Sequence, residues 1–446
     1  MKEYDVVIIG GGASGLTAAI SSARKGAKTA IMERLPRVGK KILVTGNGRC
    51  NFSNASLKRK NYHGTNPAFI GYVFSQFNGL QIQEFFEELG ILYKEEEDGR
   101  IFPRCDQAGA ILDVLRFECL RLHVEALCDR EVSTISNEDG QFKIQFQNGE
   151  EFLSRKVILT AGGKASPQFG SNGSGFALAE KLGHKIIDPY PSLVQLKLED
   201  EYLKHLKGIK VDARVSLYAD ESLIDAREGE VLFTEYGISG IPVLQLSRYV
   251  HHPEIRNKSM NLHVDLFPEI QFYDLKKQLI DRFQRLEYKS IEDSMIGLIN
   301  KRMFLPTLAL AGIDRTKLSS NLSGAEIEKL THQLKDRKFV IKGTLSWRDA
   351  QITAGGVATE EIEDRTLESK IVPGLYFAGE VIDIHGDSGG FNLAWAWASG
   401  YVAGMHAASS ILGKKKIKRR RISNVQSAFA NATARQARNN HDKREE

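Results

Sequence analysis

A glycine-rich turn near the start of the chain has the spacing of a dinucleotide-binding loop. Gly10, Gly12 and Gly15 match the pattern GxGxxG, and Glu33 follows at the end of the next apolar segment. In such a loop the first glycine permits a tight turn, the second lets the backbone approach a pyrophosphate, and the third lets a helix pack closely on a strand. The start of that helix attracts phosphate, and Glu33 can accept hydrogen bonds from a ribose. These residues predict a dinucleotide site, which by itself does not distinguish FAD from NAD.

A second signature near the other end of the chain indicates FAD. Gly379 and Glu380 end an apolar segment at 375–378, as in FAD proteins whose acidic side chain reaches the ribityl chain. Gly389 and Gly390 then precede an Ala-rich segment that is predicted to be helical. The N-terminus of that helix would stabilise an anionic reduced flavin ring.

Polar residues and glycines alternate in a third segment, residues 44–51. Arg49 is suited to bind a phosphate or to polarise a carbonyl group. Cys50 has a redox-active side chain, but none of the other cysteines lies near it in the sequence, so a dithiol relay has no visible partner. We interpret Cys50 as a packing residue or a flavin contact. The cysteine spacing fits neither a disulfide scaffold nor a zinc site, and no metal site is predicted.

The hydrophobic pattern places these motifs on an α/β fold. A strand, a helix and a second strand over residues 6–32 form a βαβ unit. The pattern changes near Pro189 to short alternating strands, and from Phe272 to charge-rich helices. We predict four parts: a discontinuous Rossmann-like domain at 1–190 and 346–412, an inserted β-rich subdomain at 191–270, an inserted helical subdomain at 271–345, and a tail at 413–446.

Charge is unevenly distributed along the 446 residues. The net charge is +5, yet residues 413–446 hold eleven Lys or Arg against three Asp or Glu, which leaves the rest of the chain at −3. No broad basic face for nucleic acid is therefore expected on the body of the protein. The basic tail is predicted to be disordered and solvated, with at most weak contacts to RNA or other acidic partners.

Two apolar segments need to be distinguished from membrane or export signals. Residues 391–412 lack charged side chains and precede a basic run, as a tail anchor does. Their many Ala, Gly and Ser residues instead favour a helix packed closely against a sheet. The apolar run at 6–9 follows Glu3 and Asp5, which argues against an export signal. We expect a cytoplasmic protein without a membrane span.

Several motifs occur together in one order: TGNGRCN at 45–51, GRIFP at 99–103, LTAGGK at 159–164, GSNGSG at 170–175, TAGGV at 353–357, FAGE at 377–380 and GDSGGFN at 386–392. With these motifs the chain resembles the bacterial NAD(P)/FAD-dependent oxidoreductases of the BaiN or aminoacetone-oxidase-like type. It is more distantly similar to fumarate reductase flavoproteins. The resemblance implies an FAD domain interrupted by a β-barrel-like and a small helical subdomain.

The motifs and the resemblance together give a set of candidate FAD-binding residues. These are Gly10, Gly12, Ala13, Ser14, Gly15, Glu33, Arg34, Lys41, Thr45, Asn47, Gly48, Arg49, Cys50, Asn51, Ala161, Gly162, Gly379, Glu380, Asp387, Gly389, Gly390, Phe391 and Asn392.

The expected function is that of an oxidoreductase with non-covalent FAD, which exchanges a hydride with a small organic substrate. BaiN-type proteins are linked to the reduction of activated C=C bonds, with NAD(P)H as a transient electron donor. Arg49 and His385 are candidates for proton transfer and charge stabilisation. Three alternatives stay open: an amine oxidase using O₂, a flavin-dependent RNA-modifying protein and a redox-sensing protein. The sequence does not indicate the oligomeric state.

Overall fold

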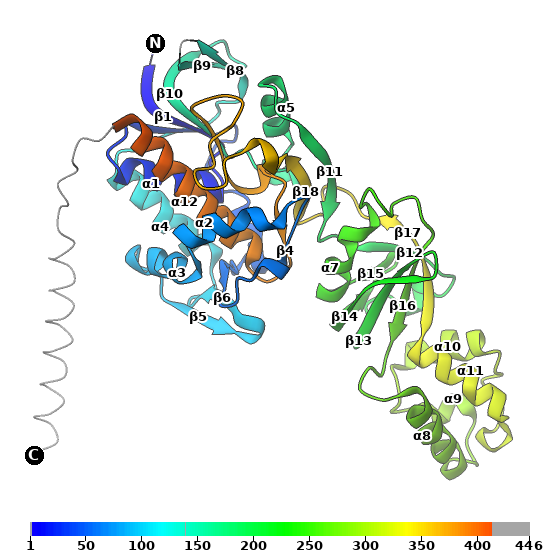
Figure 1. Cartoon of the computed structure of the whole chain (residues 1–446). Coiled ribbons are helices and arrows are strands. Elements are labelled where there is room, and N and C mark those ends of the chain that lie inside the picture. The colour runs from blue at the N-terminus through cyan, green and yellow to red at the C-terminus, as the bar shows by residue number, and fades with distance from the viewer. Residues whose placement is uncertain (1, 139, 413–446) are drawn as a thin grey trace, which may run out of the picture. The chain divides into compact units, whose positions relative to one another are not determined.

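A seven-stranded sheet forms the centre of the first domain in this computed structural model, which describes residues 2–138 and 140–412. The strand order is β7-β2-β1-β10-β9-β8, and β19 also pairs with β10. Figure 1 labels the β1, β10, β9 and β8 strands of this sheet. The parallel strands are β1 (Lys2–Ile9), β2 (Thr29–Met32), β7 (Glu125–Leu127), β10 (Glu151–Leu159) and β19 (Leu375–Phe377). The antiparallel edge consists of β8 (Val132–Glu138) and β9 (Gln141–Phe146).

Helices and small sheets surround this sheet. The helices are α1 (Ala13–Arg24), α2 (Ile70–Gln76), α3 (Gly79–Glu88), α4 (Ala108–Arg121), α5 (Ser174–Lys181) and α12 (Phe391–Leu412). The small sheets are β3 (Ser53–Asn54) with β6 (Arg100–Pro103) and β5 (Tyr93–Glu96), β4 (Tyr62–His63) with β20 (His385–Gly386), and β11 (Ile186–Ser192) with β18 (Ile352–Val357). The predicted Rossmann-like architecture is confirmed, since β1, α1 and β2 form the expected βαβ unit.

Glycines bring α12 into backbone contact with α1. A Cβ atom at Gly400 would lie 2.3 Å from the carbonyl oxygen of Ser14, and one at Gly404 would lie 2.2 Å from that of Ala18. The Ser22 hydroxyl donates a hydrogen bond of 3.0 Å to the Gly404 carbonyl. The small residues of 391–412 therefore serve close packing, as predicted, and the surface on which these two glycines pack is α1.

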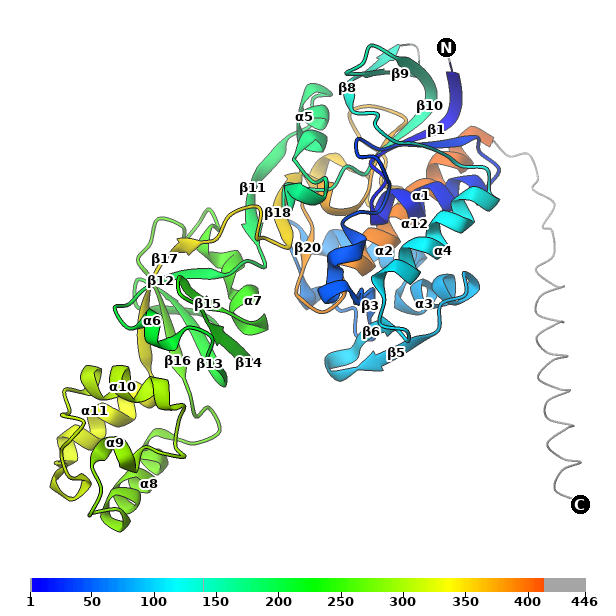
Figure 2. The ribbon, with the colours of Figure 1, turned by 180° about the vertical axis from the view of Figure 1, so that it is seen from behind.

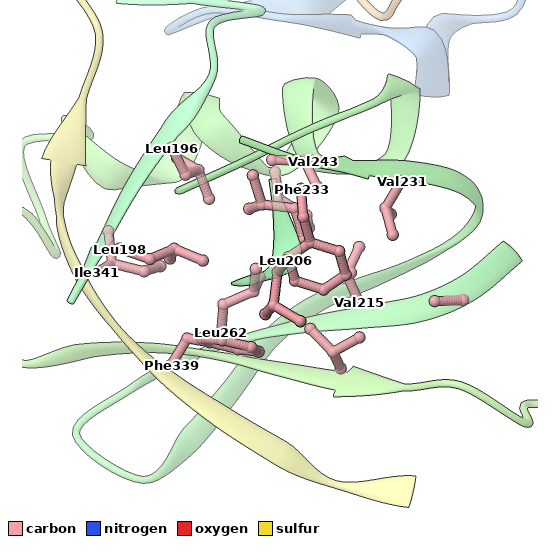
Figure 3. Packing of buried hydrophobic residues seen from close by; sticks show 14 of the residues in the cluster. Leu196, Leu198, Leu206, Val215, Val231, Phe233, Val243, Leu262, Phe339 and Ile341 are labelled. Carbon is pink, nitrogen blue, oxygen red and sulfur yellow. The ribbon is translucent and has the colours of Figure 1, made fainter. Parts of the chain in front are cut away.

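The inserted segment begins with a closed six-stranded barrel in the order β12-β15-β14-β13-β16-β17. Its elements are β12 (Leu196–Glu199), α6 (Leu203–Leu206), β13 (Lys210–Ala219), β14 (Ser222–Phe233), β15 (Gly237–Ser239), α7 (Ile241–Val250), β16 (Met260–Asp265) and β17 (Arg337–Thr344). Phe233, Leu262 and Phe339 fill the interior together with aliphatic side chains (Figure 3). The expected β-barrel-like subdomain is thus present.

The barrel boundary differs from the predicted one. The last strand of the barrel, β17, follows the helical subdomain in the sequence. The helices are therefore inserted in the chain between the barrel strands β16 and β17 (Figure 2). These helices are α8 (Phe272–Arg285), α9 (Ile291–Ser294), α10 (Phe304–Ala311) and α11 (Gly324–Lys335). They have a hydrophobic core of their own, which includes Phe283 and Leu330. The predicted helical subdomain at 271–345 was wrong at its C-terminal end, because β17 pairs with β16 and β12 and so belongs to the barrel. Such pairing between distant segments leaves no local sequence signal.

No helix in the described part of the chain is long and apolar enough to cross a membrane. The predicted disordered tail at 413–446 lies outside the described residues.

The close contact between α12 and α1 predicts a sharp difference between two glycine substitutions. Gly404→Ala should lower the free energy of unfolding by about 1–3 kcal/mol, because the added methyl group meets the backbone of α1. Gly109→Ala in α4 is the matched control, since its Cβ would meet no atom within 4 Å. Thermal unfolding followed by circular dichroism measures both, and equal melting temperatures would contradict the packing described here.

Candidate active site

One cavity of about 1240 Å³ brings together the motifs singled out in the sequence. Its wall includes the turn at 10–14, the segment after β2, residues 160–162 after β10, and the loop that precedes α12. The barrel contributes residues of β14, β15 and α7. The cavity therefore lies where the ends of the parallel strands meet the inserted barrel, the usual position of a ligand site in a doubly wound α/β fold.

The glycines of the first motif have three different environments. Gly10 has a φ of +104°, and a Cβ there would lie 2.6 Å from the Thr160 carbonyl oxygen. A Cβ at Gly15 would lie 1.9 Å from the Gly10 carbonyl oxygen, so α1 packs directly on the end of β1. A Cβ at Gly12 would meet nothing within 4 Å, and Gly12 lines the cavity. The turn is thus tight at its ends and open toward the cavity in its middle.

The N-terminus of α1 is available to an anion. Gly12 is the N-cap residue, and no side chain caps the helix. Uncapped N–H groups of a first helical turn carry a partial positive charge and hydrogen-bond readily to phosphate oxygens.

Glu33 is held in place directly beside this turn. Its carboxylate accepts hydrogen bonds from the backbone N–H of Gly11 at 2.8 Å and of Leu35 at 2.9 Å. The residue is 8% exposed and lines the cavity. A carboxylate has about four acceptor positions, so each oxygen retains one that can receive a ribose hydroxyl.

An ion pair links the second FAD signature to the segment that follows β2. Lys41 Nζ lies 3.0 Å from Glu380 Oε2 and donates a second bond of 3.2 Å to the Ala165 carbonyl. The other oxygen of Glu380 accepts the backbone N–H of Thr353 at 2.8 Å. Lys41 and Glu380 both line the cavity, so this pair fixes the second signature relative to the segment that follows β2.

Arg49 lies in the cavity wall, but its guanidinium is bound to carboxylates. Its Nε donates to Asp106 at 2.9 Å, and the same group pairs with Glu96. The guanidinium also stacks over the Phe102 ring, with 4.1 Å between its central carbon and the ring centroid. Lys94 bridges the same two carboxylates. These contacts favour a structural role for Arg49, and its predicted part in catalysis stays a prediction.

Cys50 is fully buried and does not line the cavity. Burial raises the pKa of its thiol to about 12, although a hydrogen bond with Thr45 acts in the opposite direction. The residue has a φ of +62°, in the left-handed region. Cys50 is therefore a packing residue in a strained loop, and it holds its proton at neutral pH.

The loop before α12 is fixed by its asparagine and glycines. The Asn392 side chain accepts the backbone N–H of Gly386 at 2.8 Å and donates to the carbonyl of the same residue at 2.9 Å. A Cβ at Gly390 would lie 2.2 Å from the Ser53 carbonyl oxygen. This close approach places Gly389, Gly390 and the first turn of α12 in the cavity wall.

Asp387 connects this loop to the barrel. Its carboxylate lies 2.9 Å from His63 Nε2 and 2.7 Å from Arg248 Nη1, and it also accepts a bond of 3.2 Å from Asn61. Burial alone would raise the pKa of Asp387, but the His63 hydrogen bond and the Arg248 charge hold it well below its usual range. Sequence reasoning missed Arg248 and His63, because three distant segments meet here and none has a motif that signals it.

His385 is 4% exposed and is not part of the cavity wall. Burial lowers the pKa of His385 well below the ordinary value, and electrostatic interaction with the neighbouring His63 and Arg248 lowers this pKa further. His385 is therefore neutral at physiological pH. Its predicted role as a proton donor stays a prediction, and its burial disfavours that role.

The structure gathers most of the candidate cofactor residues around the cavity. Those that do not line it are Gly15, Gly48, Cys50 and Gly379.

The residues present fit FAD. The cavity offers an uncapped helix N-terminus beside an open glycine and an acidic residue, as the ADP half requires. Asn51 lines the cavity, and its side-chain oxygen is buried without a hydrogen-bond partner among the described residues. Buried polar atoms are normally hydrogen-bonded, so this oxygen is a free acceptor for a bound cofactor or an ordered water. The described residues contain no group of His, Cys, Asp and Glu that could hold a metal ion.

The chain is similar to known proteins over most of its length. The profile of the family described as HI0933-like protein Rossmann domain matches residues 4–406. The 3-dehydro-bile acid delta(4,6)-reductase of Clostridium scindens is 39% identical over 403 residues, which cover 90% of this chain and 98% of that protein. The ribosomal RNA dihydrouridine synthase of Haemophilus influenzae is 30% identical over 412 residues, covering 91% of this chain and 99% of that protein. The protein of that name from Escherichia coli is 30% identical over 402 residues.

Solved structures include the FrdA chain of E. coli quinol fumarate reductase, with a TM-score of 0.48 at 16% identity. The match covers 98% of this chain and 74% of that chain.

The different surroundings of Gly12 and Gly15 predict different defects. Gly12→Ala should fold with an unchanged melting temperature without cofactor but bind FAD about tenfold more weakly or worse, since its methyl group enters the space open to a pyrophosphate. Gly15→Ala should fail to fold stably, because its methyl group overlaps the β1 backbone. Flavin-fluorescence titration and thermal unfolding separate the two effects. Unaltered FAD affinity in Gly12→Ala would contradict the assigned site.

The raised pKa of Cys50 predicts low reactivity. At mildly alkaline pH iodoacetamide should modify exposed Cys105 and leave Cys50 unmodified in the folded protein, because the thiolate is the reacting form. Mass spectrometry of the peptides gives the extent at each site, with urea-unfolded protein as the control in which both react. Comparable rates at the two sites in the folded protein would show that Cys50 is not buried as described.

Proposed function

Since the chain belongs to the HI0933-like (BaiN) family of FAD Rossmann proteins, as its motifs predict, we propose that it is an FAD-dependent reductase of C=C bonds conjugated to a carbonyl group. The relative from C. scindens supports this proposal, since its name states such a reaction and it aligns over 90% of this chain. The site residues in this chain are consistent with the same chemistry.

The observation that carries the proposal is a single cavity with two kinds of wall. One wall consists of the glycine turn, the Lys41–Glu380 pair and the N-terminus of α12, all of which fit FAD. The other wall comes from the barrel and includes the apolar side chains Leu232 and Leu244. A substrate bound between the two walls would have the cofactor on one side and the barrel on the other, and both would exclude water from it.

FAD, when bound, supplies the two-electron chemistry of the reaction. The N–H groups of α1 and the acidic residues Glu33 and Glu380 would hold it. The N-terminus of α12 would contribute a partial positive charge to the same cavity. We further propose NAD(P)H as a donor that binds transiently, since the chain has no second GxGxxG motif.

A second candidate substrate is a uridine base in RNA. The two ribosomal RNA dihydrouridine synthases align over nearly their whole length, and a uracil ring also contains a C=C bond conjugated to a carbonyl group. The body of the chain is acidic overall, but basic residues in the cavity wall favour this candidate. These residues are Arg34, Arg37, Lys40, Lys60, Arg100, Arg130 and Arg348. The amine-oxidase and redox-sensing alternatives rest on the flavin site alone.

Anaerobic mixing tests the proposed reaction. NADPH or NADH should bleach the flavin absorbance, and a cyclic enone should then restore it, whereas the corresponding saturated ketone should not. A uridine-containing ribosomal RNA fragment that restores the absorbance, when the same fragment with dihydrouridine does not, would support the RNA candidate. Bleaching by an amine, with no reoxidation by either C=C substrate, would contradict the proposal.

A further inference from the structure

Between residues 191 and 345, which the structure describes in full, one charged side chain lines the cavity. It is that of Arg227 on β14 of the barrel. Its neighbours in this wall are apolar or neutral: Leu193, Gln195, Leu232, Ser239, Gly240, Ile241, Leu244 and Gln245. None of the dinucleotide-binding motifs lies in the barrel. This wall is therefore the substrate side of the cavity, and Arg227 is its fixed positive charge.

Arg227 is oriented by an acidic neighbour. Its Nε and Nη2 donate to Asp225 Oδ2 at 3.1 and 2.8 Å. The Tyr249 hydroxyl donates to the same oxygen at 3.3 Å, and the other oxygen accepts the Ala226 N–H at 2.8 Å. The Arg227 Nη1 group forms no hydrogen bond with any described residue. Asp225 thus fixes one edge of the guanidinium and leaves the Nη1 donors available to a ligand.

The wall that holds Arg227 is itself anchored to the flavin domain. Tyr249 follows Arg248 on α7, and Arg248 forms the ion pair with Asp387 beside the α12 loop. The Arg248 side chain is 6% exposed and the Asp387 side chain is 5% exposed, so both charges are buried. A buried, charge-assisted pair of this kind restricts the movement of α7 against the cofactor side of the cavity.

We propose that Arg227 is the catalytic residue that binds the carbonyl oxygen of the conjugated substrate, and that Asp225 is its positioning residue. The inference rests on the proposed function. When a hydride from the reduced cofactor forms a C–H bond at the far carbon, the C=C π pair moves toward the carbonyl group and its oxygen becomes negative. Arg227 keeps its proton and stabilises this charge, and a solvent proton then closes the valence of the carbon next to the carbonyl.

A phenolate reports on this site without turnover, because it presents an anionic oxygen on a flat apolar ring. The FAD-loaded protein should bind 4-nitrophenolate, measured by its absorbance. Arg227→Gln should weaken binding about tenfold or more, since a charge-assisted hydrogen bond is lost, and Arg227→Lys should retain part of the affinity. Asp225→Asn should weaken binding less than Arg227→Gln.

Arg214→Gln is the matched control, since Arg214 pairs with Glu228 on the same barrel and does not line the cavity. It should bind the phenolate as the wild type does. FAD content and melting temperature of each variant show that it is folded. Wild-type affinity in folded Arg227→Gln, or no phenolate binding by the wild-type protein, would overturn the inference. If the protein does not reduce enones but its phenolate binding still depends on Arg227, the proposed function is overturned and the anion-binding role of Arg227 is not.

Discussion

The fold depends on close backbone contacts between elements, which leave no room for a side chain at the glycines involved. α1 lies directly on the end of β1 at Gly15, and α12 lies directly on α1 at Gly400 and Gly404. A Cβ at Gly379, in the second signature, would likewise lie 2.5 Å from the Ser14 hydroxyl. Segments that lie far apart in the sequence therefore meet at van der Waals distance, and the glycine turn that begins α1 lines the cavity beside this contact.

Ion pairs then set how the remaining walls meet this centre. The Lys41–Glu380 pair joins the segment after β2 to the second signature, and the Arg248–Asp387 pair joins the barrel to the α12 loop. Removing one partner of a buried pair leaves an uncompensated charge, which typically costs about 3–5 kcal/mol. Because the cost of taking both charges out of water offsets much of their attraction, the Arg248–Asp387 pair maintains the geometry between the barrel and the α12 loop more than it contributes net stability.

The local features were predictable from the sequence, and the long-range ones were not. The βαβ unit, the roles of Gly10 and Gly15 and the close packing of 391–412 follow from short patterns whose physical reason is steric. The return of β17 into the barrel, the carboxylates around Arg49 and the meeting of His63, Arg248 and Asp387 depend on contacts between distant segments. For the same reason Arg227 has no sequence signal, since only the closed barrel brings β14 into the cavity wall.

The absorption spectrum of the protein purified without added cofactor shows whether the cavity holds a flavin. We predict a flavin spectrum and the release of FAD on heating, identified by chromatography, because the glycine turn, Glu33 and the α12 loop line one cavity that fits FAD. A colourless protein that cannot be reconstituted with FAD would contradict this prediction. The turn from Gly10 to Gly15 would then have to be an NAD site or a structural turn.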